Sequence, residues 1–178
     1  HKHLTSMLGR KLRKELLLDS GKRLDLFDSK TNVGIEYCGL YWHHEHSPTS
    51  RLRNYHYDKM LSAQREGYRV ITVFEDEYLE RKSAVLNRLL AVLGHQDRVL
   101  QARKCSVKNV DVCTAKEFLN AHHVQGAPHA VKCAFGLYND KELVGVVTGG
   151  AHHRQGHDAA LVLSRLCFYP GTHVIGGT

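Results

Sequence analysis

Two acidic side chains near the start of the chain are spaced as a divalent metal site requires. Asp25 and Glu36 lie in residues 23–27 and 33–37, where apolar and polar residues alternate as in half-buried strands. The polar cluster at 28–32 favours a turn, so we expect a hairpin with both carboxylates on one face. Two carboxylates this close repel each other unless a hard cation lies between them, and Mg²⁺ prefers oxygen ligands with retained waters. We therefore expect Mg²⁺ at Asp25 and Glu36, with Tyr37 in the same metal-binding set; the alternative is two solvated carboxylates on a strand edge.

A run of histidines follows the second strand. His43, within WHHEH at 42–46, could take a proton from an attacking water or protonate a leaving alkoxide. His56 and Lys59 are three residues apart in a predicted helix over 54–66, so they share a face. They could supply a second imidazole and a cation for the charge that develops on a phosphorane. Each of these residues alone is typical of a solvated surface, but a histidine beside two acids favours the chemistry of a metal-dependent nuclease.

The composition agrees with a phosphate-rich partner. The 178 residues include 25 Lys+Arg and 18 Asp+Glu, a formal net charge of +7 that attracts polyanions but is also common on soluble surfaces. No run of about 18 apolar residues could span a bilayer. The 5 cysteines are scattered and contain no C-x-x-C, which fits neither a disulfide framework nor a zinc ribbon. We expect a soluble protein of a reducing, cytoplasmic compartment, and both ends of the chain are expected to belong to a longer polypeptide.

The apolar patterns of the first hundred residues predict an α/β unit. After a three-stranded meander and the helix over 54–66, the almost uninterrupted apolar run at 68–74 is typical of a parallel strand buried on both faces and reached through a helix. Leucines and Val85 at helical spacing predict one amphipathic helix over 78–93, ended by Gly94. The acids at 75–77 are expected to cap this helix and favour its dipole rather than bind metal.

The pattern changes at about residue 96, after which shorter elements follow. We expect a strand near 103–110, a helix over 114–122 and three further strands, the first two joined by a hairpin turn at Asn139 and Asp140. The chain is therefore divided near residue 98 into a domain over 1–98 and a small α+β module over 99–178. A group of histidines with Asp158 at 152–158 could bind a transition metal, but its glycine-flanked setting favours a mobile polar loop.

Four sequence elements occur in a characteristic order within residues 14–93: RLDLF, IEYCGLYWHHE, NYHYDK and GYRVITVFEDE. In this order they resemble the very-short-patch-repair endonucleases and, more closely, the phage-encoded homing endonucleases that share their fold. The resemblance implies a restriction-endonuclease-like mixed sheet core that cleaves double-stranded DNA in a phage-infected bacterial host cell. It also implies Mg²⁺ at Asp25, a catalytic histidine at His43 and an orienting polar residue near His56. Glu36 matches the second acidic position of the homing-enzyme branch.

Three positions depart from the pattern of these families. Cys38 replaces the lysine that restriction-like nucleases often carry two residues after the second acid, so Lys59 or His43 would have to substitute for it. Leu40 stands where the repair enzymes need a cysteine for their structural zinc, so no zinc is predicted there. The leading helix of the family is expected to be absent or reduced to a stub before Arg10.

The sequence therefore predicts a Mg²⁺-dependent DNA endonuclease, without specifying its target sequence or oligomeric state. Asp25 and Glu36 would hold the metal, His43 would manage the proton, and Lys59 and His56 would stabilise charge, while the second module positions DNA. One alternative is a non-catalytic DNA-binding remnant that kept the fold. Another is an acyl-CoA-dependent transferase, because LSRLCFYPG running into VIGGT faintly resembles the N-acetyltransferase superfamily, in which a glycine-containing loop binds pyrophosphate.

Overall fold

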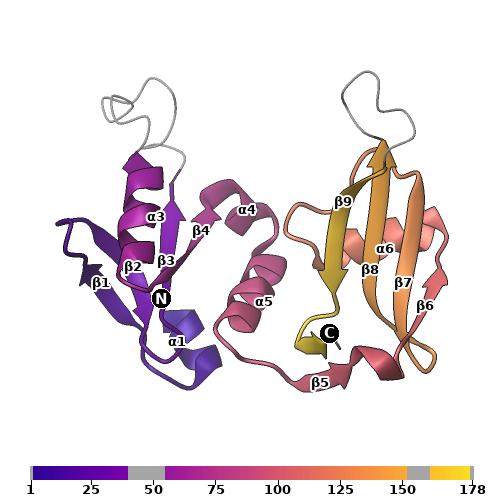
Figure 1. Ribbon diagram of the computed structural model, residues 1–178, viewed down its shortest axis with the longest axis horizontal. Helices are drawn as coiled ribbons and strands as arrows, with labels where there is room; N and C mark the ends of the chain where they lie inside the picture. The colour runs from indigo at the N-terminus through magenta and orange to yellow at the C-terminus, as the bar shows by residue number, and fades with distance from the viewer. Residues whose placement is uncertain (1, 40–54, 152–160, 177–178) are drawn as a thin grey trace. The chain divides into compact units, whose positions relative to one another are not determined.

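The computed structural model describes residues 2–39, 55–151 and 161–176. The chain divides into two compact units, residues 1–95 and 96–178, so the boundary lies between His95 and Gln96, whereas the sequence places it near residue 98. Both units combine helices with β-sheet, so the fold is of the mixed α/β class (Figure 1). No helix among the described residues is long and apolar enough to cross a membrane.

The first unit is built on a four-stranded sheet in the order β1-β2-β3-β4. Strands β1 to β3 form the expected antiparallel meander, and β4 runs parallel to β3, as the crossover through a helix predicts. The elements in chain order are α1 (Lys2–Leu8), β1 (Arg13–Leu17), β2 (Arg23–Asp28), β3 (Val33–Cys38), α3 (Tyr55–Arg65), β4 (Arg69–Phe74), α4 (Glu75–Glu80) and α5 (Lys82–Val92).

Two predictions for this unit are wrong in detail. In β4 only Ile71 and Val73 are buried, because β4 is an edge strand among the described strands and pairs with β3 alone. The single helix expected over 78–93 is two helices, since the backbone of Arg81 (φ −134°, ψ 43°) leaves the helical region between them. The acids at 75–77 form the first turn of α4, where they favour its dipole, and Asp76 Oδ1 accepts a hydrogen bond from the Glu77 N–H at 2.8 Å. The N-cap residue is Phe74, which makes no side-chain capping bond.

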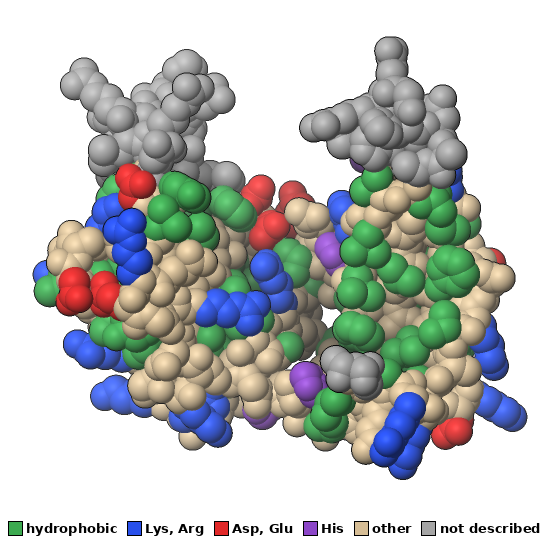
Figure 2. Space-filling view, in the orientation of Figure 1, with side chains coloured by type: hydrophobic (Ala, Val, Ile, Leu, Met, Phe, Trp, Pro, Cys, Tyr) green, Lys and Arg blue, Asp and Glu red, His purple; other side chains and the backbone are tan. Residues whose placement is uncertain are grey.

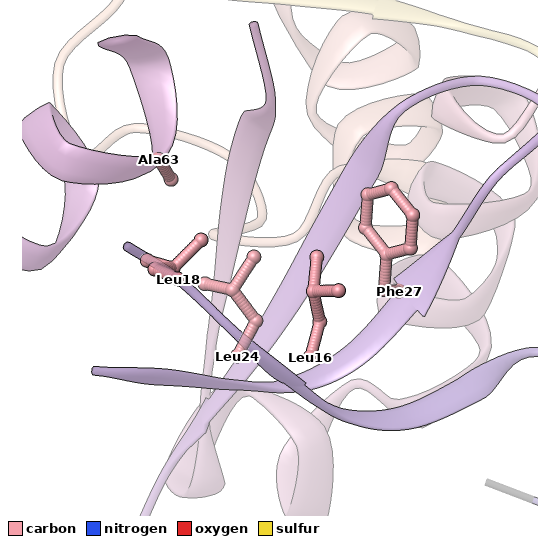
Figure 3. Close-up of a cluster of buried hydrophobic side chains, with 5 residues drawn as sticks. All are labelled: Leu16, Leu18, Leu24, Phe27 and Ala63. Atoms are coloured by element: carbon pink, nitrogen blue, oxygen red, sulfur yellow. The ribbon is translucent and has the colours of Figure 1, made fainter. Parts of the chain in front are cut away.

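A cluster of buried apolar side chains fixes α3 and the hairpin in the first unit. Figure 3 shows its members projecting from β2, from β1 and the turn that follows it, and from α3: Leu16, Leu18, Leu24, Phe27 and Ala63. Gly34 on β3 leaves room for Leu24, since a Cβ atom there would lie 2.6 Å from the leucine Cδ1. Each fully buried leucine contributes roughly 1.5–3 kcal/mol. This packing sets the side-by-side placement of β2 and β3 on which the candidate site depends.

A partly buried ion pair joins three segments at the other end of β2. Asp28 is 2% exposed and accepts hydrogen bonds from Arg10 Nε (3.1 Å), Arg10 Nη2 (2.7 Å) and the Thr31 hydroxyl. Arg10 also donates to the Leu93 carbonyl just after α5. Burial by itself would raise the pKa of Asp28, but the hydrogen bonds from Thr31 and Arg10 and the guanidinium charge outweigh it, so the pKa is lowered. The network ties the segment after α1 and the end of α5 to the β2–β3 turn.

Replacing Arg10 tests the contribution of this network to stability. Arg10→Met leaves a buried carboxylate without its cation, and breaking a buried pair in this way costs about 3 kcal/mol or more. Since the pKa of Asp28 is lowered in the folded protein, the stabilisation is fully present above the ordinary value of 3.8 and is lost as the pH falls through the lowered one. Urea denaturation should therefore show a gap in unfolding free energy between wild type and variant that is largest at neutral pH and narrows as the pH falls and the Asp28 carboxylate is protonated.

The matched control is Arg23→Met. It breaks the 3.1 Å pair of Arg23 with Glu15, whose side chains are 60% and 69% exposed. An exposed pair contributes only about 0–1 kcal/mol. Equal losses of unfolding free energy in the two variants would contradict a special role for the Arg10 network.

The second unit contains a four-stranded antiparallel sheet in the order β6-β7-β8-β9 and a parallel pair of β5 with β10. The strand expected near 103–110 is shorter and follows a 3-10 turn. The helix expected from 114 begins at Val112, because Asp111 caps it by accepting a hydrogen bond from the Thr114 N–H. The elements are β5 (Arg98–Gln101), η2 (Ala102–Lys104), β6 (Ser106–Asn109), α6 (Val112–His122), β7 (Cys133–Asn139), β8 (Glu142–Ala151), β9 (Leu161–Phe168) and β10 (Thr172–Ile175).

The two faces of this sheet differ in what covers them. Helix α6 packs on one face, where Ala115 and Leu119 meet Ala134 and Val146. The strand register puts a set of exposed apolar side chains on the opposite face: Val107, Phe135, Leu161, Leu163, Leu166 and Phe168. Figure 2 shows apolar surface over β8 and β9 of the second unit. An apolar sheet face offers no charged group to a phosphate, so this face is poorly suited to bind a polyanion.

Candidate metal and catalytic site

The β2–β3 register brings Asp25 and Glu36 face to face. The paired residues of the ladder end at Leu26 and Ile35, and the next step places the two acids opposite each other. Beyond the ladder, the Asp25 N–H donates to Glu36 Oε1 at 3.2 Å, and the Tyr37 N–H donates to Asp25 Oδ2 at 2.8 Å. The two carboxylates thus replace backbone pairing at this end of the hairpin.

The two carboxylates lie in different environments. Asp25 is exposed, whereas Glu36 is 6% exposed. Burial raises the pKa of Glu36, and this effect outweighs the hydrogen bond and charge of Lys59, which lower it; the Asp25 charge raises it further. Asp25 can therefore contact solvent, whereas Glu36 needs a cation inside the protein.

Lys59 supplies that cation from α3. Its Nζ atom lies 2.5 Å from Glu36 Oε2, and both side chains are 8% exposed. Ala63, one helical turn later, is fully buried, so the face of α3 that carries Lys59 packs against the sheet. Of the two substitutes proposed for the lysine missing at Cys38, Lys59 is placed at Glu36 by the structure. Cys38 is itself buried, and burial followed by the charges of Glu36 and Asp25 raises the pKa of its thiol.

The histidines predicted for the site fall into two groups. His56 is described and exposed, with its ring 5.5 Å from that of Tyr55 in an edge-on contact, so burial separates it from Lys59 on the same helix. The two residues are three apart on α3, as the sequence predicts, and their joint role in catalysis stays a prediction. His43 lies outside the described residues, as does the group at 152–158, and their roles stay predictions.

The side chain of Tyr37 is a poorer candidate for a metal ligand than the sequence suggests. Its N–H holds Asp25, while its phenol is exposed and lies edge-on to Tyr78 at a ring distance of 6.1 Å. Partial desolvation of the hydroxyl, followed by the charge and hydrogen bond of Glu75, raises the pKa of Tyr37. A phenol that stays protonated is a poor Mg²⁺ ligand, so only the main-chain carbonyl of Tyr37 is suited to the metal.

Glu75, which the sequence predicts at the start of a helix and outside the site, lies beside Tyr37 in the structure. Strands β3 and β4 are parallel, with Cys38 paired to Phe74, so the residue that follows β4 lies at the same sheet end as Tyr37. The signal was present in the sequence, because functional residues gather at the carboxyl ends of parallel strands.

The donor set fits Mg²⁺ better than a transition metal. Among the described residues no group of three or more His, Cys, Asp and Glu side chains is placed to hold an ion. Structural zinc needs four nitrogen or sulfur ligands, whereas Mg²⁺ is commonly held by one or two carboxylates and keeps several waters. Asp25, Glu36 and the Tyr37 carbonyl are oxygen donors at one strand end, and the exposure of Asp25 leaves room for those waters.

Comparisons with protein-family models, with curated proteins and with solved structures give no match to this chain. The function is therefore argued from the chemistry and geometry of the site.

A double-mutant cycle without metal tests the pairing of Glu36 with Lys59. Lys59→Met leaves a buried carboxylate unpaired and should lower the free energy of unfolding by about 3–5 kcal/mol. Glu36→Gln/Lys59→Met carries neither charge and should recover most of that loss, giving a coupling energy near the top of the range of about 0.5–3 kcal/mol. Chemical denaturation of the wild type, both single variants and the double variant measures it.

The control cycle uses Arg98 and Glu142, which form a 2.7 Å pair with side chains 33% and 49% exposed. Its coupling should be about 0.2–1 kcal/mol. Additive losses at Glu36 and Lys59 would show that the two residues are not energetically paired.

Proposed function

We propose that this chain is a Mg²⁺-dependent endonuclease that hydrolyses phosphodiester bonds in double-stranded DNA. The observation that carries the proposal is the meeting of Asp25 and Glu36 at the end of a mixed sheet, with Lys59 directed at Glu36 from the crossover helix. Three antiparallel strands followed by a helix and a parallel strand also support the restriction-endonuclease-like core that the sequence motifs imply. A homing enzyme related to very-short-patch-repair endonucleases is the biological role that we infer from those motifs.

The described residues divide the work of phosphodiester hydrolysis among them. Asp25, Glu36 and the Tyr37 carbonyl would hold Mg²⁺, which when bound polarises the scissile phosphate and acidifies a water. Asp25 is the exposed member of the set and would be the one to meet the substrate. The Lys59 ammonium provides positive charge for the oxyanion that develops on phosphorus. We assign proton transfer to His43, and His56, exposed on α3, to contact with the phosphate backbone.

The second unit is proposed to position DNA through its basic residues rather than through its open sheet face. Arg103, Lys104 and Lys108 are exposed in η2 and β6, whereas the face that carries Leu163 and Leu166 is apolar. Lysine and arginine contacts to phosphates supply affinity without sequence information and release counterions. The second unit would thus strengthen binding, and the first unit would carry the chemistry.

Removing the exposed Asp25 carboxylate should abolish DNA cleavage and leave DNA binding intact. Asp25→Ala takes away a ligand that Mg²⁺ needs, so nicking of plasmid DNA in Mg²⁺ should fall to background. Binding measured in Ca²⁺ or without metal should be unchanged or slightly stronger, since an anion has left a cationic interface. Asp140→Asn, in the β7–β8 turn, removes the same charge far along the chain and should cleave like wild type. Full activity of Asp25→Ala would refute the assignment, and binding without cleavage by the wild type would favour the non-catalytic remnant.

His43 should be required for the proton transfer. A positioned general base or acid contributes about 10² to 10⁴ in rate, so His43→Ala should be slower by that factor at neutral pH. The variant should also lose the acidic limb of the pH–rate profile, because that limb reports protonation of the imidazole. The neighbouring substitution His44→Ala is the control and should retain both rate and profile. A wild-type pH–rate profile in His43→Ala would show that His43 does not transfer the proton.

The salt dependence of DNA binding tests the role of the second unit. Lys104→Gln/Lys108→Gln should flatten the slope of log affinity against log salt by up to about 2, because each phosphate contact contributes about 0.9. Lys132→Gln/Lys141→Gln removes the same charge from other exposed positions of that unit and should change the slope much less. Identical slopes for wild type and the first variant would mean that η2 and β6 do not touch DNA.

A further inference from the structure

Lys59 occupies the position at Glu36 that a divalent cation would take. Its ammonium lies 2.5 Å from Glu36 Oε2, and Glu36 Oε1 already accepts the Asp25 N–H. Both oxygens of the buried carboxylate are therefore engaged. Asp25 lies in a different situation, since it is exposed and its Oδ2 atom accepts from the Tyr37 N–H, a neutral donor. A metal entering from the solvent side meets an accessible Asp25 first and a Glu36 that is held by a competing cation.

Two cations bound to one carboxylate in a site with little water repel each other strongly, because the field of each is poorly screened. Metal at Glu36 and the Lys59–Glu36 pair therefore oppose each other. This opposition is reciprocal. If Lys59 weakens metal binding by a certain free energy, bound metal weakens the Lys59–Glu36 pair by the same free energy.

We propose that Lys59 is an internal counter-cation that exchanges with the divalent metal at Glu36. Without metal, its ammonium neutralises the buried carboxylate and holds α3 on the sheet. Metal binding takes over Glu36 and releases the ammonium, which then becomes available to the phosphate. The inference rests on the proposed metal site, and it makes the charge that stabilises the reaction depend on metal loading.

Metal affinity of the full-length chain tests the exchange. Mn²⁺ alone is titrated without DNA, and free Mn²⁺ is followed by electron paramagnetic resonance. Lys59→Met removes the competing cation and should bind Mn²⁺ more tightly, by a factor in the roughly 5- to 150-fold range of energetic couplings between sites. Arg65→Met is the matched control, since it removes one positive charge from the exposed last turn of the same helix, and its affinity should change far less.

Two further variants separate failure of the exchange from failure of the proposed site. Asp25→Asn and Glu36→Gln should each weaken Mn²⁺ binding. If they do, and Lys59→Met binds Mn²⁺ no more tightly than wild type, the exchange is wrong and the metal site stands. If neither weakens binding, the metal lies elsewhere and the proposed site is wrong as well.

A measurement on the wild-type chain covers the case in which Lys59→Met does not fold. Reductive methylation modifies accessible lysines, and mass spectrometry follows each of them. Saturating Mg²⁺ should speed modification of Lys59 severalfold, because its ammonium leaves a buried pair, while exposed Lys141 in the second unit should react at the same rate with and without metal. Unchanged protection of Lys59 at a Mg²⁺ concentration that saturates the protein would overturn the proposal.

Discussion

Burial of the Glu36 carboxylate is the constraint around which the first unit is organised. A carboxylate taken out of water is costly unless a cation and hydrogen bonds replace its lost hydration. Lys59 brings the cation from α3, and the Asp25 N–H brings a hydrogen bond from β2. One side chain of β3 therefore ties the crossover helix and the hairpin together, so whatever fixes these elements also fixes the candidate site.

The pairing of β2 with β3 is fixed at the turn and by packing within the strands. At the turn, Asn32 adopts a left-handed backbone conformation (φ 55°), and the Arg10–Asp28 pair joins the end of β2 to α5. In the middle, Gly34 leaves the space that Leu24 fills. A slip of one residue would turn Asp25 to the other face of the sheet and away from Glu36. The geometry of the acids is thus a consequence of core packing, not of contacts between the acids alone.

Features encoded by local patterns were predictable from the sequence. Period-two alternation and the polar turn predicted the hairpin, and the hairpin placed Asp25 beside Glu36. The parallel placement of β4 followed from the helix before it. Features set by long-range packing were not predictable from the sequence. Lys59 is buried and His56 exposed because of the orientation of α3 on the sheet. The leucines of 78–93 keep helical spacing across the break at Arg81, so their pattern did not reveal two helices. Glu75 joins Tyr37 only through the β3–β4 pairing.

Diffraction from crystals soaked in Mn²⁺, read from the anomalous signal of the ion, tests the central claim most directly. The account predicts one ion with an oxygen of Asp25 and an oxygen of Glu36 both in its coordination shell, at about the 2.0–2.1 Å typical of Mg²⁺ or slightly longer. An anomalous peak away from both carboxylates, or none at a concentration that supports binding in solution, would contradict it.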